Sequence, residues 1–167
     1  VGSTESVTVG PTNSLKDAIA SVGDGGTVYL KAGTYSLNGF GGKTGRKYWT
    51  TLRPAEGVRR GEVKFSSGRP GMDKFRLKDV LLYTDSDGYS AIVNGENGST
   101  VCWLDNCKFT CVGGRYRGNS NLFGNKMGGF VTGGVTEGMN NGPDGSLIRD
   151  HYVHSIAADT WTGSERL

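Results

Sequence analysis

The chain has 167 residues, a formal net charge of +3 and 35% hydrophobic residues, which is enough apolar material for one folded domain. Its 29 glycines follow no triplet period, so a collagen-like fibre is excluded, and its hydrophobic and aromatic content excludes a fully disordered chain. No run approaches the roughly 20 apolar residues of a membrane-spanning helix.

The first predicted element is a short helix over residues 14–22. Its apolar face, at helical spacing, consists of Leu15, Ala18, Ile19 and Val22. Asn13 or Ser14 can cap its first turn. Beyond this helix, glycines are scattered among short β-branched and aromatic runs, which predicts many short strands joined by tight turns and hence an all-β protein.

The helix is followed by residues 23–35, which read GDGGTVYLKAGTY. A helix followed by this turn and strand resembles the opening of the pectate-lyase superfamily, which includes polysaccharide lyases, glycoside hydrolases and phage tailspikes. The resemblance implies a right-handed parallel β-helix whose first coil is capped by the helix. Gly33 suits a turn that needs positive φ or close backbone approach.

Three segments share one pattern of aliphatic, polar and apolar positions and independently indicate a solenoid: 77–82, 104–109 and 148–153. Stacking them predicts three aligned rows. The rows are Leu77, Leu104 and Ile148; Leu82, Phe109 and Val153; and, at the corner between strands, Asp79, Asn106 and Asp150. A short polar side chain suits such a corner because it tolerates a left-handed conformation.

We therefore expect residues 1–167 to form a single β-helix domain that is the N-terminal part of a longer solenoid or a piece of an assembly. Residues 113–145 are glycine-rich and are expected to protrude as a loop region. No closing helix follows Val153, so the C-terminal end is expected to be uncapped.

Positive charge is concentrated in residues 43–78, which hold eleven of the 19 Lys and Arg residues against three carboxylates. This segment predicts a surface for an acidic polysaccharide or another anionic partner, with a solvated face or contact with an acidic subunit as the alternatives. Nucleic acid is disfavoured because no reading motif accompanies the charge. The candidate binding residues are Arg46, Lys47, Trp49, Arg53, Arg59, Arg60 and Arg76.

The aromatic residues have two open interpretations. Tyr48, Trp49, Trp103, Tyr116 and Trp161 provide either sugar-stacking platforms or core and ladder packing. The three cysteines, Cys102, Cys107 and Cys111, lack metal-ligand spacing and are expected to be small buried thiols.

A catalytic candidate lies near the C-terminus, where acid and base groups cluster: Arg149, Asp150, His154 and Asp159. Such groups could cleave a glycosidic bond or abstract a proton beside a uronate carboxylate. The alternative is packing, because the neighbouring His151 takes the repeat position of Val80 and Cys107. Asp85 and Asp87 could contribute to a calcium site, although a simple turn explains them as well.

Two functions follow as hypotheses. One is a non-catalytic structural or glycan-binding β-helix module of a larger virion, tailspike-like or cell-surface assembly, located outside the cell. The other is the N-terminal portion of a polysaccharide lyase or glycoside hydrolase that acts on an acidic polysaccharide. The family motifs of calcium-dependent lyases have no counterpart here, so no catalytic position is carried over from the resemblance.

Overall fold

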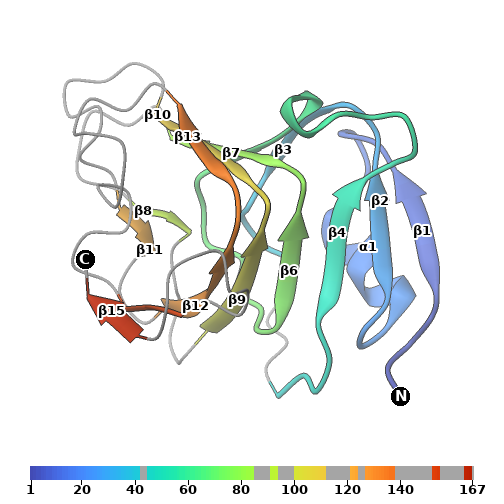
Figure 1. Ribbon diagram of the computed structural model, residues 1–167. Helices are drawn as coiled ribbons and strands as arrows, with labels where there is room; N and C mark the ends of the chain where they lie inside the picture. Colours follow the sequence, from blue (N-terminus) through green and yellow to red (C-terminus); the bar gives the residue numbers. More distant parts are fainter. Residues whose placement is uncertain are drawn as a thin grey trace.

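The computed structural model describes residues 1–41, 45–84, 91–93, 100–111, 121–123, 127–137, 152–154 and 164–166. These residues form a parallel β-solenoid of about four turns with one short helix near the N-terminus, which confirms the predicted fold class (Figure 1). Among them, no helix is long and apolar enough to cross a bilayer.

The first and largest sheet runs along the solenoid from its N-terminal end. In spatial order its strands are β1 (Ser6–Val9), β2 (Thr27–Leu30), β4 (Thr50–Pro54), β6 (Phe75–Lys78), β9 (Thr100–Asp105), β12 (Met127–Thr132), β14 (Tyr152–His154) and β15 (Ser164–Arg166). All neighbours are parallel except β14 and β15, which are antiparallel. Each turn of the chain therefore returns to the same sheet one strand further along.

Two further sheets complete the coils. The second contains β3 (Gly33–Ser36), β5 (Val63–Ser66), β7 (Leu81–Thr84), β10 (Lys108–Cys111) and β13 (Val135–Glu137), in that order. The third pairs β8 (Ala91–Val93) with β11 (Asn121–Phe123), and Gly68 forms a bridge to Val93. A 3₁₀-helix, η1 (Arg60–Glu62), precedes β5.

The helix α1 (Leu15–Val22) lies at the N-terminal end of the solenoid, beside β1 and β2 (Figure 1). Of the two predicted caps, Ser14 is the one used: its hydroxyl accepts a hydrogen bond from the Asp17 N–H at 3.2 Å. Ala18, Ile19 and Val22 are buried, as the helical spacing predicted. The helix thus covers apolar surface that the first coil would otherwise expose.

The interior of the first sheet is an aliphatic ladder with one residue from each coil. Strand register aligns Val28, Leu52, Leu77, Leu104 and Val131, and each has no exposed surface. Burial of such side chains stabilises a fold by about 1.5–3 kcal/mol each. The ladder confirms the predicted alignment of Leu77 with Leu104.

A second interior row belongs to the second sheet, where register aligns Tyr35, Phe65, Leu82 and Phe109. All four are buried, and the rings of Tyr35 and Phe65 stack with centroids 5.5 Å apart. The predicted pairing of Leu82 with Phe109 is therefore confirmed.

The corner between the two sheets has a left-handed residue in three successive coils: Asp79 (φ 56°), Asn106 (φ 53°) and Gly133 (φ 61°). Asn106 Nδ2 donates to Asp79 Oδ1 at 2.8 Å, which links successive corners. The predicted role of Asp79 and Asn106 is confirmed. Gly33 also has positive φ (150°), and a side chain there would meet Pro11.

The third member of the predicted repeat was wrong. The coil after 104–109 is formed by β12 and β13, where Val131 pairs with Leu104 and Thr136 with Phe109. Val153 lies on β14 in the first sheet and so cannot continue the row of Leu82 and Phe109. The predicted loop region 113–145 contains β11, β12 and β13, while Ile148 and Asp150 lie outside the described residues.

Candidate functional site

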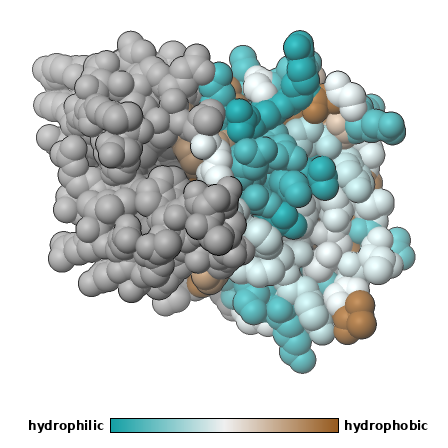
Figure 2. All heavy atoms as spheres, viewed as in Figure 1, coloured by the Kyte–Doolittle hydropathy of each residue, from teal (hydrophilic) through white to brown (hydrophobic). Residues whose placement is uncertain are grey.

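The outer face of the first sheet carries the most developed constellation of polar and aromatic side chains in the described residues. Side chains alternate between the two faces of a strand, so the neighbours of the buried ladder point outward. One outward row aligns Thr51, Arg76, Trp103 and Phe130. In Figure 2, hydrophilic residues gather in a patch that runs from the upper edge of the coloured part of the molecule to its middle.

Arg76 and Asp105 form the centre of this constellation. Arg76 Nε donates to Asp105 Oδ2 at 3.0 Å, and Nη2 donates to the same oxygen. The Arg76 guanidinium lies 3.9 Å from the centroid of the Trp103 ring, which is a cation–π contact. Lys78 Nζ lies 4.0 Å from Asp105 Oδ2. One carboxylate therefore faces two cations.

Thr132 links the carboxylate to the indole. Its hydroxyl donates to Asp105 Oδ1 at 2.9 Å and accepts a hydrogen bond from Trp103 Nε1, also at 2.9 Å. The side chains of Arg76 and Asp105 are 23% and 16% exposed, so the pair is shielded but still reaches the surface. The four side chains hold one another in a fixed arrangement before any ligand arrives.

An aromatic cluster adjoins this network. Trp49 immediately precedes β4, and its ring meets Trp103 edge-on at 5.7 Å and Phe130 edge-on at 5.9 Å between centroids. All three residues are partly exposed. Partly exposed indoles beside fixed hydrogen-bonding groups form a surface on which a sugar ring can stack.

A groove of about 420 Å³ lies at the N-terminal side of the same sheet. Tyr29 and Arg53 form one wall, and the loop at 55–58 and Asp79 contribute the rest. Arg53 Nη2 lies 3.8 Å from Asp79 Oδ2, and Arg53 Nε is buried without a hydrogen-bond partner. This ion pair is looser than that of Arg76 with Asp105.

Arg46 lies inside the fold. It is 8% exposed, its Nη2 donates to the Gly23 carbonyl at 3.0 Å and to Thr50 Oγ1, and its Nε lies 3.7 Å from Asp24 Oδ1. These contacts join the turn before β2 to the segment before β4. The geometry gives Arg46 a structural role.

Asp24 orders the segment that contains Lys47. Its carboxylate accepts hydrogen bonds from the N–H groups of Lys47 (3.0 Å) and Tyr48 (3.2 Å). Burial on its own raises the pKa of Asp24, but these two hydrogen bonds and the charges of Arg46 and Lys74 outweigh it and lower that pKa. The Lys47 residue itself is exposed.

Arg59 and Arg60 lie at η1, on the loop that leads to the second sheet. Arg59 Nε is 2.9 Å from Glu62 Oε1, with the arginine side chain 88% exposed. Arg60 Nη1 donates to the carbonyl (3.3 Å) and the side-chain oxygen (3.2 Å) of Asn106. The predicted basic residues thus lie in several separate places on the solenoid. Of the predicted binding residues, Arg76 and Trp49 both contact Trp103.

The predicted catalytic and calcium residues fall mainly outside the described part of the chain: Arg149, Asp150, Asp159, Asp85 and Asp87. His154 lies on β14, and its backbone pairs with Phe130, which continues the outward row of Arg76 and Trp103. Within the described residues, no group of three or more His, Cys, Asp or Glu side chains could hold a metal ion.

The predicted binding residues did not include Lys78, Trp103, Asp105, Phe130 or Thr132, although Trp103 was among the candidate stacking platforms. The signal for two of them was present in the repeat. Aligning Leu77 with Leu104 places Trp103 beside Arg76, and it places Asp105 beside Lys78. The outward positions of the repeat therefore predict that Arg76 lies beside Trp103 and that Lys78 lies beside Asp105.

Cys102 and Cys107 are buried free thiols, as predicted. Burial raises the pKa of both, and the pKa of Cys107 reaches about 12. They are packing residues of the interior and take no part in the surface constellation.

Comparisons with protein-family models, with curated proteins and with solved structures give no match.

Proposed function

We propose that this chain is a non-catalytic, glycan-binding structural module of a larger assembly outside the cell, of the virion, tailspike-like or cell-surface kind. We further propose that it belongs to the pectate-lyase-like superfamily. The residues 23–35, the helix at the end of the solenoid and the parallel coils support that assignment. A rigid solenoid gives such a module a long surface with a fixed spacing between side chains.

The observation that carries the binding proposal is the contact set of Arg76, Asp105, Thr132 and Trp103. A sugar offers hydroxyl groups that both donate and accept hydrogen bonds, and a paired arginine and aspartate supply both kinds of partner. The adjacent Trp49 and Trp103 rings supply apolar area for the sugar face. Because the network already holds its own geometry, binding loses little side-chain freedom.

The charge of this face favours an acidic glycan. Its described residues include the cations Arg53, Arg76 and Lys78 and the carboxylates Asp79 and Asp105. At the constellation itself two cations, Arg76 and Lys78, face the single carboxylate of Asp105, and this excess of one positive charge attracts a uronate or other acidic sugar. Pairing of the remaining charges disfavours a bare phosphate polymer, which depends on many free cations.

The test is a calorimetric titration of the purified protein with oligogalacturonates and, separately, with neutral cello-oligosaccharides. We expect the acidic series to bind and Trp103→Ala to weaken binding by about fivefold, since stacking on an aromatic ring contributes on the order of 1 kcal/mol. Tyr48→Ala is the control, because Tyr48 is an exposed aromatic outside the constellation. Equal affinities of the two variants for the acidic oligosaccharides would contradict a binding site at Trp103.

The alternative proposal is the N-terminal portion of a polysaccharide lyase or glycoside hydrolase. The backbone pairing of His154 with Phe130 favours it, because that register puts one candidate acid–base residue on the strand next to β12 in the first sheet. Incubation with polygalacturonate, followed by ultraviolet absorbance for unsaturated products and by reducing-end analysis, separates the two proposals. Product formation that His154→Ala abolishes would support the enzyme, and calcium addition would test the candidate metal residues Asp85 and Asp87.

A further inference from the structure

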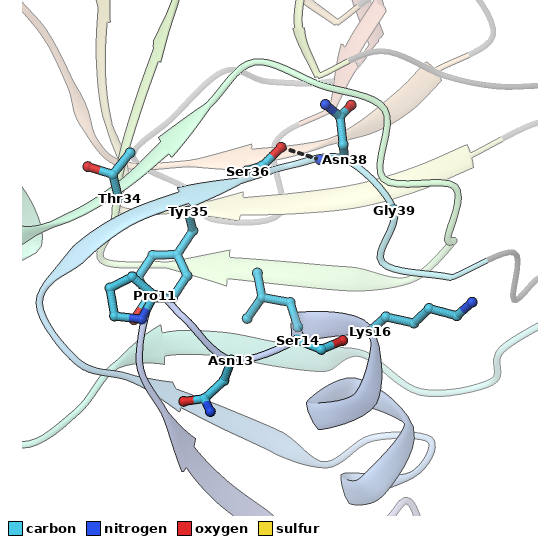
Figure 3. Close-up of a pocket in the computed structure, with 10 residues that line it drawn as sticks. Pro11, Asn13, Ser14, Lys16, Thr34, Tyr35, Ser36, Asn38 and Gly39 are labelled. Carbon is cyan, nitrogen blue, oxygen red and sulfur yellow. Dashed lines mark hydrogen bonds between the residues drawn. The ribbon is translucent and has the colours of Figure 1, made fainter.

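The second sheet ends at β3, and the outer edge of this strand faces a pocket at the start of α1. The strand pairs on one side with β5 and has no strand on its other side among the described residues. The pocket has a volume of about 460 Å³ and is lined by residues of β3, the turn after it and the start of α1 (Figure 3).

The backbone of β3 presents unused hydrogen-bonding groups to this pocket. The Leu37 N–H donates to the Ser66 carbonyl, so odd-numbered residues of this stretch face β5. In a parallel ladder, alternate residues direct both N–H and C=O to the same side. The N–H and C=O groups of Thr34 and Ser36 therefore point away from β5, and none of them has a backbone partner in the described structure.

Pro11 and Lys16 lie at the two ends of the pocket (Figure 3). Pro11 packs against Gly33, where an added Cβ would lie 2.1 Å from the proline ring. At the other end Lys16 extends beneath the turn at Gly39 and approaches Gly41 (Figure 3). The open edge between them follows the four residues of β3 and is about 13 Å long. An edge of this length accommodates a short extended segment.

The pocket is chemically selective. Its described lining residues include one cation, Lys16, and no carboxylate. The N-terminus of α1 adds the positive end of the helix dipole. The buried Tyr35 ring and the half-buried Leu15 line the floor, which suits a small aliphatic side chain. The complementary occupant has a free backbone edge, an apolar residue and an acidic residue.

We propose that this pocket binds a short, acidic, extended peptide segment of a partner protein, which adds to β3 as an edge strand. Backbone hydrogen bonds to Thr34 and Ser36 supply the affinity, and Lys16 supplies the selection for acidic residues. The proposal concerns the second sheet and does not depend on glycan binding at the first. It gives the module a means of attachment within an assembly.

The probe is a capped, dye-labelled peptide with the sequence Asp-Val-Thr-Val-Asp, compared by fluorescence anisotropy with its Asn-Val-Thr-Val-Asn counterpart. Placing an acidic residue at each end makes the test independent of strand direction. We expect the acidic peptide to bind about fivefold more tightly, as one favourable charge contact predicts. Failure of both peptides to bind, or equal binding of the two, would overturn the proposal.

Two variants locate the site. Ser36→Pro removes an outward N–H that no ladder bond uses, and we expect about fivefold weaker binding, with Ser36→Ala as the matched control. Lys16→Glu reverses the charge on an exposed helix position and should abolish the preference for the acidic peptide, whereas Lys31→Glu should not. Circular dichroism melts verify that each variant is folded.

Unchanged binding by both Ser36→Pro and Lys16→Glu would place the peptide elsewhere and overturn the proposal. Concentration-dependent dimerisation of the unliganded protein that Ser36→Pro abolishes, measured by sedimentation, would replace the partner peptide with a second copy of this chain.

Discussion

On the inner face of the first sheet, Leu77 and Leu104 belong to a ladder of interchangeable aliphatic residues with no exposed surface. One residue earlier in the same strands, Arg76 and Trp103 lie on the outer face and meet in a cation–π contact. The inner row depends on volume and burial, which many residues can satisfy. The outer row depends on particular atoms at particular distances, which few substitutions preserve.

This comparison explains why the two faces carry different roles. A solenoid can extend its inner ladder by repetition, because each coil buries the same kind of side chain. Its outer face is free to differ from coil to coil, and Arg76, Asp105 and Thr132 use that freedom to join three strands. The contrast can be tested by substitutions and by acidification.

The largest effect is expected at the inner face. Leu77→Ala should lower the free energy of unfolding by about 3 kcal/mol, because it leaves a cavity in the middle of the ladder. Chemical denaturation followed by circular dichroism measures the loss. Lys64→Ala, on the exposed face of β5, is the control and should change stability little. A loss below about 1 kcal/mol for Leu77→Ala would contradict the ladder.

The next effect is expected at the outer face. Asp105→Asn should cost about 1–2 kcal/mol of unfolding free energy, because Arg76 and Lys78 then lose their shared carboxylate. A double-mutant cycle with Arg76→Gln isolates the pair. Glu62→Gln removes the far more exposed pair with Arg59 and should have no measurable effect. A coupling indistinguishable from zero would show that the outer network is not preorganised.

The corner provides an effect of similar size, in which the backbone contribution can be separated from that of the side chain. Asn106 has φ 53°, so Asn106→Ala should cost roughly 1–2 kcal/mol in left-handed strain. Asn106→Gly avoids that strain and loses only the contacts with Asp79 and Arg60, so it should cost less than the alanine variant. Thermal unfolding of the two variants compares them directly, and the reverse order would exclude a left-handed corner.

The smallest effect is a pH dependence at Asp24. Its pKa is lowered in the folded protein, so its contribution to stability is present above the ordinary value of 3.8 and is lost as pH falls through the folded pKa. Acidification below that value should therefore destabilise the wild type more than Asp24→Asn. Stability curves between neutral pH and pH 2.5 measure the difference, and parallel curves would show that Asp24 makes no such contribution.

Much of the fold can be predicted from the sequence because interior positions require apolar residues at a regular spacing. The spacing of Leu15, Ala18 and Ile19 identified α1, and the repeat identified the alignment of Leu77 with Leu104. The coil formed by β12 and β13 was not predicted, and there is a physical reason for this. Its corner residue is Gly133, which reaches positive φ without cost, so the coil lacks the polar marker that Asp79 and Asn106 provide.

The site was harder to predict because its partners are distant in the chain. The basic segment 43–78 suggests an unbalanced positive surface, yet Arg46, Arg53 and Arg76 lie beside Asp24, Asp79 and Asp105, all of which lie outside that segment. Composition gives only the number of charged residues, whereas strand register determines which of their side chains lie close together. The aromatic contacts of Trp49 with Trp103 depend on register in the same way.

The most direct test of a glycan site on the outer face is a nuclear magnetic resonance titration of protein labelled with ¹⁵N at its tryptophans. Oligogalacturonate is added while the indole N–H signals are followed, with Trp49→Phe and Trp103→Phe variants to assign them. We predict that the signals of Trp49 and Trp103 shift together and saturate at one affinity. Binding of the glycan with both of these signals unmoved would contradict the account.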